Sequence, residues 1–199
     1  MKLVGRYDSP YVRRVGVSLH ALAIQFEHIP LSPFSQSGEF RKYAVIGRMP
    51  ALVLDDGETL IESAAILDYL DEVAGPARAL IPHSGLDRRR ALRILASATA
   101  ACDKAIAINY ERRRRPETIS VEWLSRCRSQ LKAALGELEG YRLVLLDHEP
   151  LRQVEITAAC TYAYVRRIES DAVGGVHCPW LTRLSAACEA RPQFLACPQ

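Results

Sequence analysis

The sequence has little net charge and no long apolar run, and each absence excludes a class of protein. Its 26 basic residues nearly balance its 23 acidic residues, which leaves a net charge of +3. Charge alone therefore gives no indication of a nucleic-acid or membrane partner. No apolar run approaches the roughly 20 residues that a membrane-spanning helix needs. We expect a protein with no nucleic-acid partner and no membrane partner.

The sequence also has no C-x-x-C pair and no apolar leader. The cysteines all lie in the second half of the chain, and their spacing is unlike that of a zinc site, so we expect no metal. The first residues have a strand-like pattern instead of the apolar core of a signal peptide, which predicts a cytoplasmic protein with reduced, inert thiols. The cysteines are Cys102, Cys127, Cys160, Cys178, Cys188 and Cys197.

Strand and helix signals alternate in the first part of the chain. Pro10 suits the first turn of a helix, where its missing N–H costs nothing. Asp55-Asp56-Gly57 is typical of a hairpin turn, and Gly75-Pro76 ends the last helix of this part. The expected order is β-α-β-α-β-β-α. The strands are expected at residues 2–6, 26–31, 51–54 and 59–61, and the helices begin at Pro10, near Glu39 and at Ser63.

After a linker at residues 76–85, nearly every signal is helical. With 199 residues, of which 49% are apolar, the chain is large enough for one or two domains with real cores. The pattern predicts a small α/β domain at residues 1–76, followed by an all-α domain at residues 86–199. The expected helices of the second domain are at residues 86–115, where Pro116 stops the helix, and at 121–139, 154–171 and 179–190.

This order of elements and four sequence stretches resemble the cytosolic glutathione S-transferases, in particular their serine-type and bacterial members. The resemblance covers both domains. It implies a thioredoxin-like, glutathione-binding N-terminal domain and an all-helical C-terminal domain. It also implies glutathione as cosubstrate, a homodimer and a role in detoxification. The stretches are SPYVRRV (9–15), GRMPALVLDDGETLIESAAILDYLDE (47–72), QVEITAACTYAYV (153–165) and CPWLTRLSAACEARPQF (178–194).

The sequence departs from the family pattern at two places. The core helix of the second domain has Arg152 and Glu155 where the family has a Ser/Thr cap and an Asp. Because a lost cap costs about 1 kcal/mol, we expect this helix start to be less well fixed unless a neighbour compensates. The other departures lie near the expected glutathione site. Ala44 and Val45 replace the family's Asn-Pro, Arg48 replaces Lys, and Met49 replaces Val.

Ser9 and Tyr7 are the two candidates for contact with the glutathione sulfur. A free thiol has a pKa of about 8.5, so the thiolate is a minority species at neutral pH. A helix N-terminus and a hydroxyl donor both favour the thiolate, and Ser9 stands where these two effects meet. Tyr7 is a candidate because tyrosine-type members use a phenol near the end of the first strand. It ranks second because strand alternation could point it into the core instead. On local sequence alone, a helix cap is the better-supported role of Ser9, and it is the whole-chain resemblance that favours contact with the thiolate.

The resemblance also implies which residues bind the rest of glutathione. Met49-Pro50 resembles the family's cis-proline step, which would expose the Met49 backbone to the cysteinyl part of the peptide; otherwise Pro50 is an ordinary edge-strand proline. Glu62 and Ser63 resemble the pair that binds the γ-glutamyl end, and Ser63 can also cap its helix. Arg48 is a candidate partner for the glycine carboxylate, or a solvated surface arginine.

The second, electrophilic substrate is expected between the domains. Asn109 and Tyr110 are candidates for this site on the first long helix. Arg13 is a third candidate, because it lies one helical turn from Ser9, although a solvent-facing charge explains it equally well. The basic run at residues 112–115 is better explained as a solvated helix end than as a nucleic-acid site, because cations are favoured at a helix C-terminus.

Together these features predict a glutathione S-transferase. It would stabilise the glutathione thiolate and add it to an electrophilic, largely apolar small molecule, with no metal required. Two alternatives stay open, because a fold does not decide a reaction. One is another glutathione-dependent reaction, such as isomerisation, dehalogenation or ether cleavage. The other is a non-catalytic binding or regulatory member of the fold.

Overall fold

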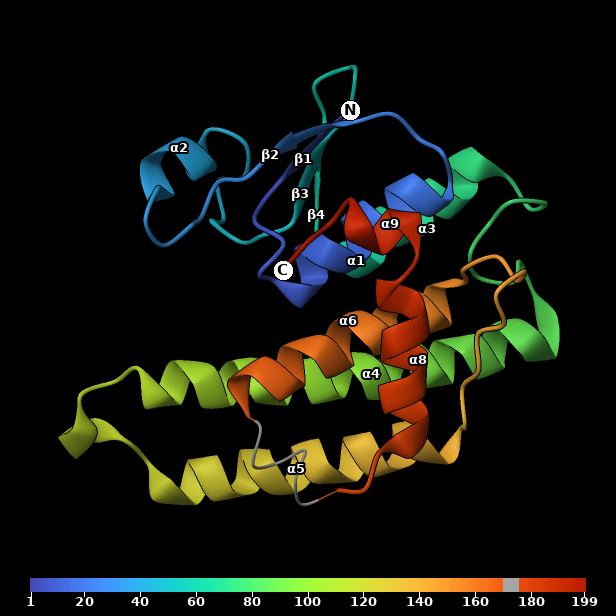
Figure 1. Ribbon diagram of the computed structural model, residues 1–199. Helices are drawn as coiled ribbons and strands as arrows, with labels where there is room; N and C mark the ends of the chain where they lie inside the picture. The colour runs from blue at the N-terminus through green and yellow to red at the C-terminus, as the bar shows by residue number, and fades with distance from the viewer. Residues whose placement is uncertain (170–175) are drawn as a thin grey trace.

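The computed structural model describes residues 1–169 and 176–199, and in it a four-stranded sheet packs above a layer of long helices (Figure 1). The strand order is β2-β1-β3-β4. β1 runs parallel to β2 and antiparallel to β3, and β3 and β4 form a hairpin. The strands are β1 (Lys2–Val4), β2 (Glu27–Ile29), β3 (Ala51–Val53) and β4 (Thr59–Ile61).

The helices of the first part lie on both faces of this sheet. α1 and α3 lie between the sheet and the long helices, whereas α2 lies at the outer side (Figure 1). Phe40 on α2 is fully buried against Val4 and Ala51 of the sheet. Ala44 belongs to the same small core, whereas its neighbour Val45 is 82% exposed. The helices are α1 (Pro10–Ala21), α2 (Ser37–Arg41) and α3 (Ser63–Ala74).

The second part is helical throughout its described residues. α4 packs along α5 and α6, and α6 also packs against α1 and α8, so α6 joins the two parts. The main core is continuous from α1 to α8. The elements are α4 (Gly85–Arg112), a short 3-10 helix η1 (Pro116–Thr118), α5 (Val121–Gly140), α6 (Gln153–Ile168), α8 (Pro179–Glu189) and α9 (Pro192–Leu195).

The predicted fold class is confirmed: a thioredoxin-like domain precedes a helical one. Several element ends differ from the prediction by one to three residues, and three of them show how the chain departs from it. β1 ends before Gly5, whose φ of +139° leaves the strand conformation. α4 ends at Arg112, because Pro116 favours an extended Arg115, whose ψ is 138°. α6 ends at Ile168, and the last two residues of its predicted span lie outside the described residues.

The start of α6 has the compensating contacts that its missing Ser/Thr cap requires. The Glu155 carboxylate accepts the Arg152 backbone N–H at 3.1 Å, which is one half of a capping box. The Gln153 N–H donates to the Leu80 carbonyl at 3.1 Å. The buried Gln153 side chain also bonds Ser18 of α1 and Thr157. The helix start is therefore held by Glu155 and by the linker before α4.

Candidate functional site

A cavity of about 410 Å³ opens between the thioredoxin-like part and the C-terminal ends of α4 and α6. Its walls combine aromatic and aliphatic side chains with three arginines and one carboxylate. The size falls within the range of sites for small organic molecules. The lining residues are Arg6, Asp8, Ser9, Pro10, Ser32, Phe34, Met49, Ile106, Asn109, Tyr110, Arg113, Tyr164, Arg167 and Ile168.

Ser9 lies on the wall of this cavity, at the N-terminus of α1. Its backbone is extended, and its Oγ accepts the Val12 N–H at a long 3.5 Å. Pro10 follows as the first helical residue. Among residues 1–169 and 176–199, the Ser9 hydroxyl donates to no protein acceptor. Its proton is therefore available to a ligand in the cavity, while the oxygen serves as the helix cap.

Tyr7 points away from the cavity. Its ring stacks on His28, with 4.0 Å between ring centroids and 16° between planes. It also lies next to Gly16 of α1, where a Cβ atom would come within 2.6 Å of the Tyr7 ring. Burial, followed by the nearby Cys197 thiol, raises the pKa of Tyr7 far above its usual value. The structure thus places Ser9, and not Tyr7, at the cavity.

The Met49-Pro50 peptide bond is cis, as the resemblance implied. Met49 lines the same cavity as Ser9, whereas Pro50 is buried just before β3. Gly5 makes this approach feasible, because a Cβ there would meet Val12 at 2.6 Å and the Met49 Cβ at 3.2 Å. The backbone of Met49 is therefore brought beside the start of α1.

Arg48, Glu62 and Ser63 are not among the residues that line this cavity. The Arg48 Nη2 and Glu62 Oε2 atoms are 3.2 Å apart, and both side chains are more than half exposed. Such an exposed pair is weak and can be exchanged for a ligand. Glu62 has a φ of 69°, which turns the chain sharply into α3. Ser63 is buried, and its Oγ accepts both Nε and Nη2 of Arg14, the latter at 2.7 Å.

Arg14 was missed by the sequence analysis. Its guanidinium is buried, and this burial lowers its pKa, with the Tyr11 phenol and nearby thiols acting in the opposite direction. Its cation is also 5.4 Å from the centroid of the Tyr11 ring. Its position behind Ser63 brings a positive charge to the start of α3. Helical spacing placed Arg14 on α1 but gave no indication of this contact.

Asn109 and Tyr110 of α4 lie on the cavity wall. The Asn109 amide donates to the Tyr164 hydroxyl at 3.5 Å. Tyr110 meets Phe34 edge to face, with 5.8 Å between ring centroids. These two aromatic rings bridge the loop after β2 and the end of α4, and they form an apolar part of the wall.

Arg13 lies away from this cavity, contrary to the expected place in the electrophile site. Its guanidinium is only 2% exposed and pairs with Glu189 of α8. One helical position separates Arg13 from Arg14, yet the two side chains point to different neighbours, at α8 and α3. The contacts of Arg13 therefore favour a structural role between α1 and α8.

The cavity also contains charged residues that the sequence analysis did not select. Arg6 pairs with Asp8 at 3.5 Å, and Arg167 donates to the Asp8 carbonyl at 2.6 Å. The third arginine of the cavity is Arg113, which directly follows α4. The basic run was the available signal for Arg113, but it was interpreted only as a solvated helix end.

The six cysteines all lie in the described part of the chain. All six cysteines are free and buried. Burial raises the pKa of Cys102 and of Cys188 to about 12, which makes their thiolates scarce at neutral pH. Within residues 1–169 and 176–199, no group of three potential metal ligands comes together. In the same residues, no helix is long and apolar enough to cross a membrane.

The fold and the cavity define a class of protein with a thioredoxin-like domain, a helical domain and a site between them. A model of the glutathione S-transferase N-terminal domain matches residues 3–78. An uncharacterized GST-like protein, YibF of Escherichia coli K12, is 31% identical over 171 residues, covering 84% of each chain. The chain therefore belongs to the glutathione S-transferase family.

Two further relatives extend the comparison. A maleylacetoacetate isomerase of Pseudomonas aeruginosa is 35% identical over 108 residues, which cover 52% of this chain and 50% of that protein. A glutathione transferase family member from Pseudomonas fluorescens Pf-5, solved with bound glutathione, is 29% identical. Its TM-score is 0.83, and the match covers 98% of this chain and 97% of that one.

Proposed function

We propose that this protein is a glutathione transferase that conjugates glutathione to a small electrophile in the cavity. The observation that carries the proposal is the position of Ser9: it is the helix-capping residue on the wall of the cavity that Met49 of the cis peptide bond also lines. The Pseudomonas fluorescens relative, which has the same fold, was solved with bound glutathione.

Ser9 would act on the sulfur by hydrogen bonding. The glutathione thiol loses its proton to solvent, and the Ser9 hydroxyl donates to the resulting thiolate. The partial positive charge at the N-terminus of α1 favours the same anion. Both effects lower the thiol pKa from about 8.5, so that more thiolate is present at neutral pH. The thiolate then forms a C–S bond to the electrophile, and a leaving group departs or an activated double bond is protonated.

The remaining parts of glutathione have candidate partners on the same domain. The Met49 backbone would pair with the cysteinyl segment, as an added strand does. Glu62 would bind the α-ammonium, and Ser63 with the N-terminus of α3 would receive the α-carboxylate. Arg14 supports this end, because it already donates to Ser63. Arg48 would exchange Glu62 for the glycine carboxylate.

The electrophile would occupy the part of the cavity formed by α4. Asn109 and Tyr110 lie there with Ile106, and Phe34 covers them from the loop after β2. This wall is largely apolar, which suits an electrophile with an apolar body. Holding both reactants in one cavity would convert a bimolecular reaction into a step within a complex.

We also propose the organisation that the sequence predicted. The glutathione-binding domain would span residues 1–76 and the helical domain residues 86–199, which is consistent with the family match to residues 3–78. The protein would work in the cytoplasm as a homodimer, and its natural role would be detoxification. Sedimentation of the purified protein tests the dimer directly.

A second candidate function is a glutathione-dependent isomerisation. The match to the maleylacetoacetate isomerase of Pseudomonas aeruginosa favours it, although it covers about half of each chain. Here the thiolate would add to a double bond and later leave, so glutathione would be regenerated. Product analysis separates the two reactions, because only conjugation consumes glutathione. Dehalogenation, ether cleavage and a non-catalytic binding role are further alternatives.

A Ser9→Ala variant tests the proposal, with Ser32→Ala as the matched control. Ser32 also lines the cavity and is equally buried, and its Oγ likewise accepts a backbone N–H, from Phe34. Unlike Ser9, it lies in a loop and not at a helix N-terminus. We expect Ser9→Ala to retain glutathione binding, to raise the pKa of the bound thiol and to lower kcat/KM by about tenfold or more. Ser32→Ala should change neither. The ultraviolet absorbance of the thiolate follows the pKa.

Two results would contradict the proposal. Unchanged turnover of several electrophiles by Ser9→Ala would remove Ser9 from the catalytic role. Calorimetry without any glutathione binding at millimolar concentration would reject glutathione chemistry altogether. A protein that binds glutathione but accelerates no reaction would support the non-catalytic alternative.

A further inference from the structure

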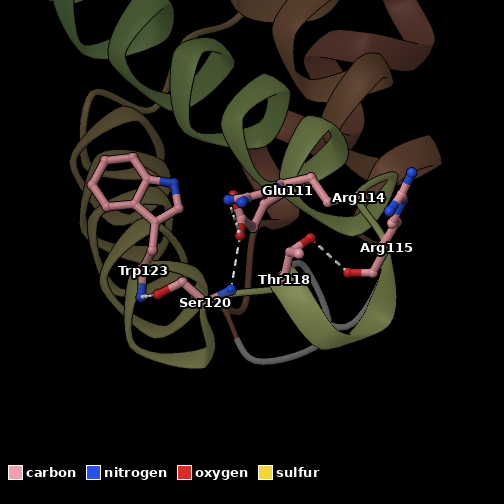
Figure 2. Close-up of polar contacts among 6 residues, drawn as sticks. All are labelled: Glu111, Arg114, Arg115, Thr118, Ser120 and Trp123. Atoms are coloured by element: carbon pink, nitrogen blue, oxygen red, sulfur yellow. Dashed lines mark hydrogen bonds and ion pairs between the residues drawn. The ribbon is translucent and has the colours of Figure 1, made fainter.

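The four arginines at the end of α4 have four different environments, although they look alike in the sequence. Arg112 pairs with Glu169 at 2.5 Å and donates to the Ile168 carbonyl. Arg114 pairs with Glu111 at 3.1 Å. The Arg115 carbonyl accepts the Thr118 hydroxyl, as Figure 2 shows. All four side chains are exposed. Arg113 alone among the four lines the cavity.

The neighbours of Arg113 hold the chain at this point in a defined position. Glu111 accepts the Ser120 N–H at 2.8 Å as well as the Arg114 guanidinium, which ties the end of α4 to the start of α5 (Figure 2). Glu169, only 1% exposed, bonds both Arg112 and Arg128 of α5. The segment that carries Arg113 is therefore fixed on both sides by ion pairs.

Arg113 stands on the same side of α4 as the proposed electrophile wall. Ile106, Asn109, Tyr110 and Arg113 follow one another at helical spacing, and all four line the cavity. The positive charges of Arg113 and, second, of Arg48 oppose the rise in the pKa of Tyr110 that burial causes. Of these two arginines, Arg113 lines the cavity together with Tyr110, beside the apolar part of the wall.

The cavity has an excess of positive charge, which a neutral substrate would not use. Three arginines line it against one carboxylate, that of Asp8. One carboxylate oxygen of Asp8 pairs with Arg6, and the Asp8 carbonyl accepts from Arg167. Among the residues that the structure describes, Arg113 forms no salt bridge. An anion bound beside Tyr110 would supply the counter-charge of Arg113.

We propose that Arg113 binds a carboxylate of the second substrate, so that the preferred electrophiles are small amphipathic acids. The apolar body would pack on Phe34, Ile106 and Tyr110, and the acid group would meet the guanidinium. Arg113 belongs to the helical part, whereas the candidates for glutathione, from Met49 to Ser63, belong to the thioredoxin-like part. This inference rests on the proposed function, and it narrows the class of electrophile.

The test uses a pair of compounds that differ at one group, a free carboxylate or its methyl ester: chlorodinitrobenzoate and methyl chlorodinitrobenzoate. In both, the glutathione thiolate attacks the carbon that bears chlorine, a C–S bond forms, and chloride leaves with the electrons of the C–Cl bond. The thiol proton goes to solvent. The two glutathione conjugates are the probes for binding by calorimetry, and the parent compounds are the probes for turnover.

The wild-type protein should bind the carboxylate conjugate more tightly than the ester conjugate by about tenfold to a hundredfold, the effect of one charge-assisted hydrogen bond. Arg113→Leu should abolish this preference and leave the affinity for glutathione and for the ester conjugate within about twofold. Its retained ester binding also shows that the variant is folded. Arg113→Lys should keep part of the preference. Arg115→Leu, with the same change of net charge, should keep all of it.

Three outcomes would overturn the inference: no carboxylate preference in the wild type, a preference that survives Arg113→Leu, or an equal loss of glutathione and both conjugates in that variant. The last would assign Arg113 to glutathione itself. The proposed function fails separately. If the preference depends on Arg113 but neither parent compound reacts faster than in buffer, the transferase proposal is wrong and the carboxylate site stands.

Discussion

Arg13 of α1 and Glu189 of α8 form a two-point ion pair, with both nitrogen–oxygen distances at 2.6 Å. The third donor of the guanidinium, Nε, bonds the Cys197 carbonyl at 2.8 Å. The cation also lies 5.2 Å from the centroid of the Phe194 ring. One buried arginine thus joins the thioredoxin-like part to α8, α9 and the last residues of the described chain.

Replacing Glu189 by Gln should destabilise the protein without affecting the cavity. The variant leaves the buried Arg13 cation without its counter-charge, and we expect a loss of about 1–3 kcal/mol in the free energy of unfolding. The partial exposure of Glu189 keeps the effect below that of a fully buried pair. Urea denaturation measures it. Glu117→Gln, at an exposed position of η1, is the control and should change little.

An unchanged unfolding free energy for Glu189→Gln would show that solvent replaces the carboxylate at no cost. A large loss of glutathione turnover at unchanged stability would instead return Arg13 to the site, as the sequence first suggested.

Tyr7→Phe should leave turnover nearly unchanged. The Tyr7 ring stacks on His28 inside the thioredoxin-like part, so its hydroxyl does not reach a sulfur beside Ser9. We expect kcat/KM with glutathione and an aryl chloride to stay within about threefold of the wild type. Steady-state kinetics measures this, with Ser9→Ala assayed in parallel. A fall for Tyr7→Phe as large as that for Ser9→Ala would reverse the ranking of the two residues.

Glu111 should make the connection between α4 and α5 sensitive to acid. The Ser120 N–H, followed by Arg114, holds the pKa of this carboxylate below its usual value of 4.5 (Figure 2). A carboxylate with a lowered folded pKa stabilises the protein above its unfolded pKa, and this contribution is lost as the pH falls through the folded value. The unfolded state binds more protons in that window.

Glu111→Gln should therefore be less stable than the wild type at neutral pH, and the difference should shrink below about pH 4.5. Urea denaturation between neutral and acid pH follows it. Glu117→Gln serves again as the control, with a difference that does not depend on this contact. A difference between Glu111→Gln and wild type that stays constant down to the acid limit would mean that the Glu111 contacts do not depend on its charge.

The elements whose cause is local could be predicted from the sequence. Ser9-Pro10 marked the start of α1, and Asp55-Asp56-Gly57 marked the hairpin of β3 and β4, because caps and turns depend on neighbouring residues. The end of α4 was placed three residues late, although Pro116 was recognised. The extended Arg115 that precedes it shortened the helix further.

The direction of side chains on helices could not be predicted, because it depends on segments far apart in the chain. Arg13 and Arg14 are neighbours, yet one bonds α8 and the other bonds Ser63 of α3. The run from Arg112 to Arg115 had one explanation in the sequence. In the structure its residues have different partners: Arg114 pairs with Glu111, Arg112 pairs with Glu169, and Arg113 lines the cavity.

By itself the sequence determined the order of elements, the change from an α/β pattern to a helical one, and the place of a capping hydroxyl before α1. These follow from periodicity, turns and caps, which act over a few residues. Only the tertiary structure decided that Ser9 faces a cavity while Tyr7 does not, and that Arg113 faces the same cavity from α4. Those positions depend on how α1, α4 and α6 pack, and packing brings together residues more than a hundred positions apart.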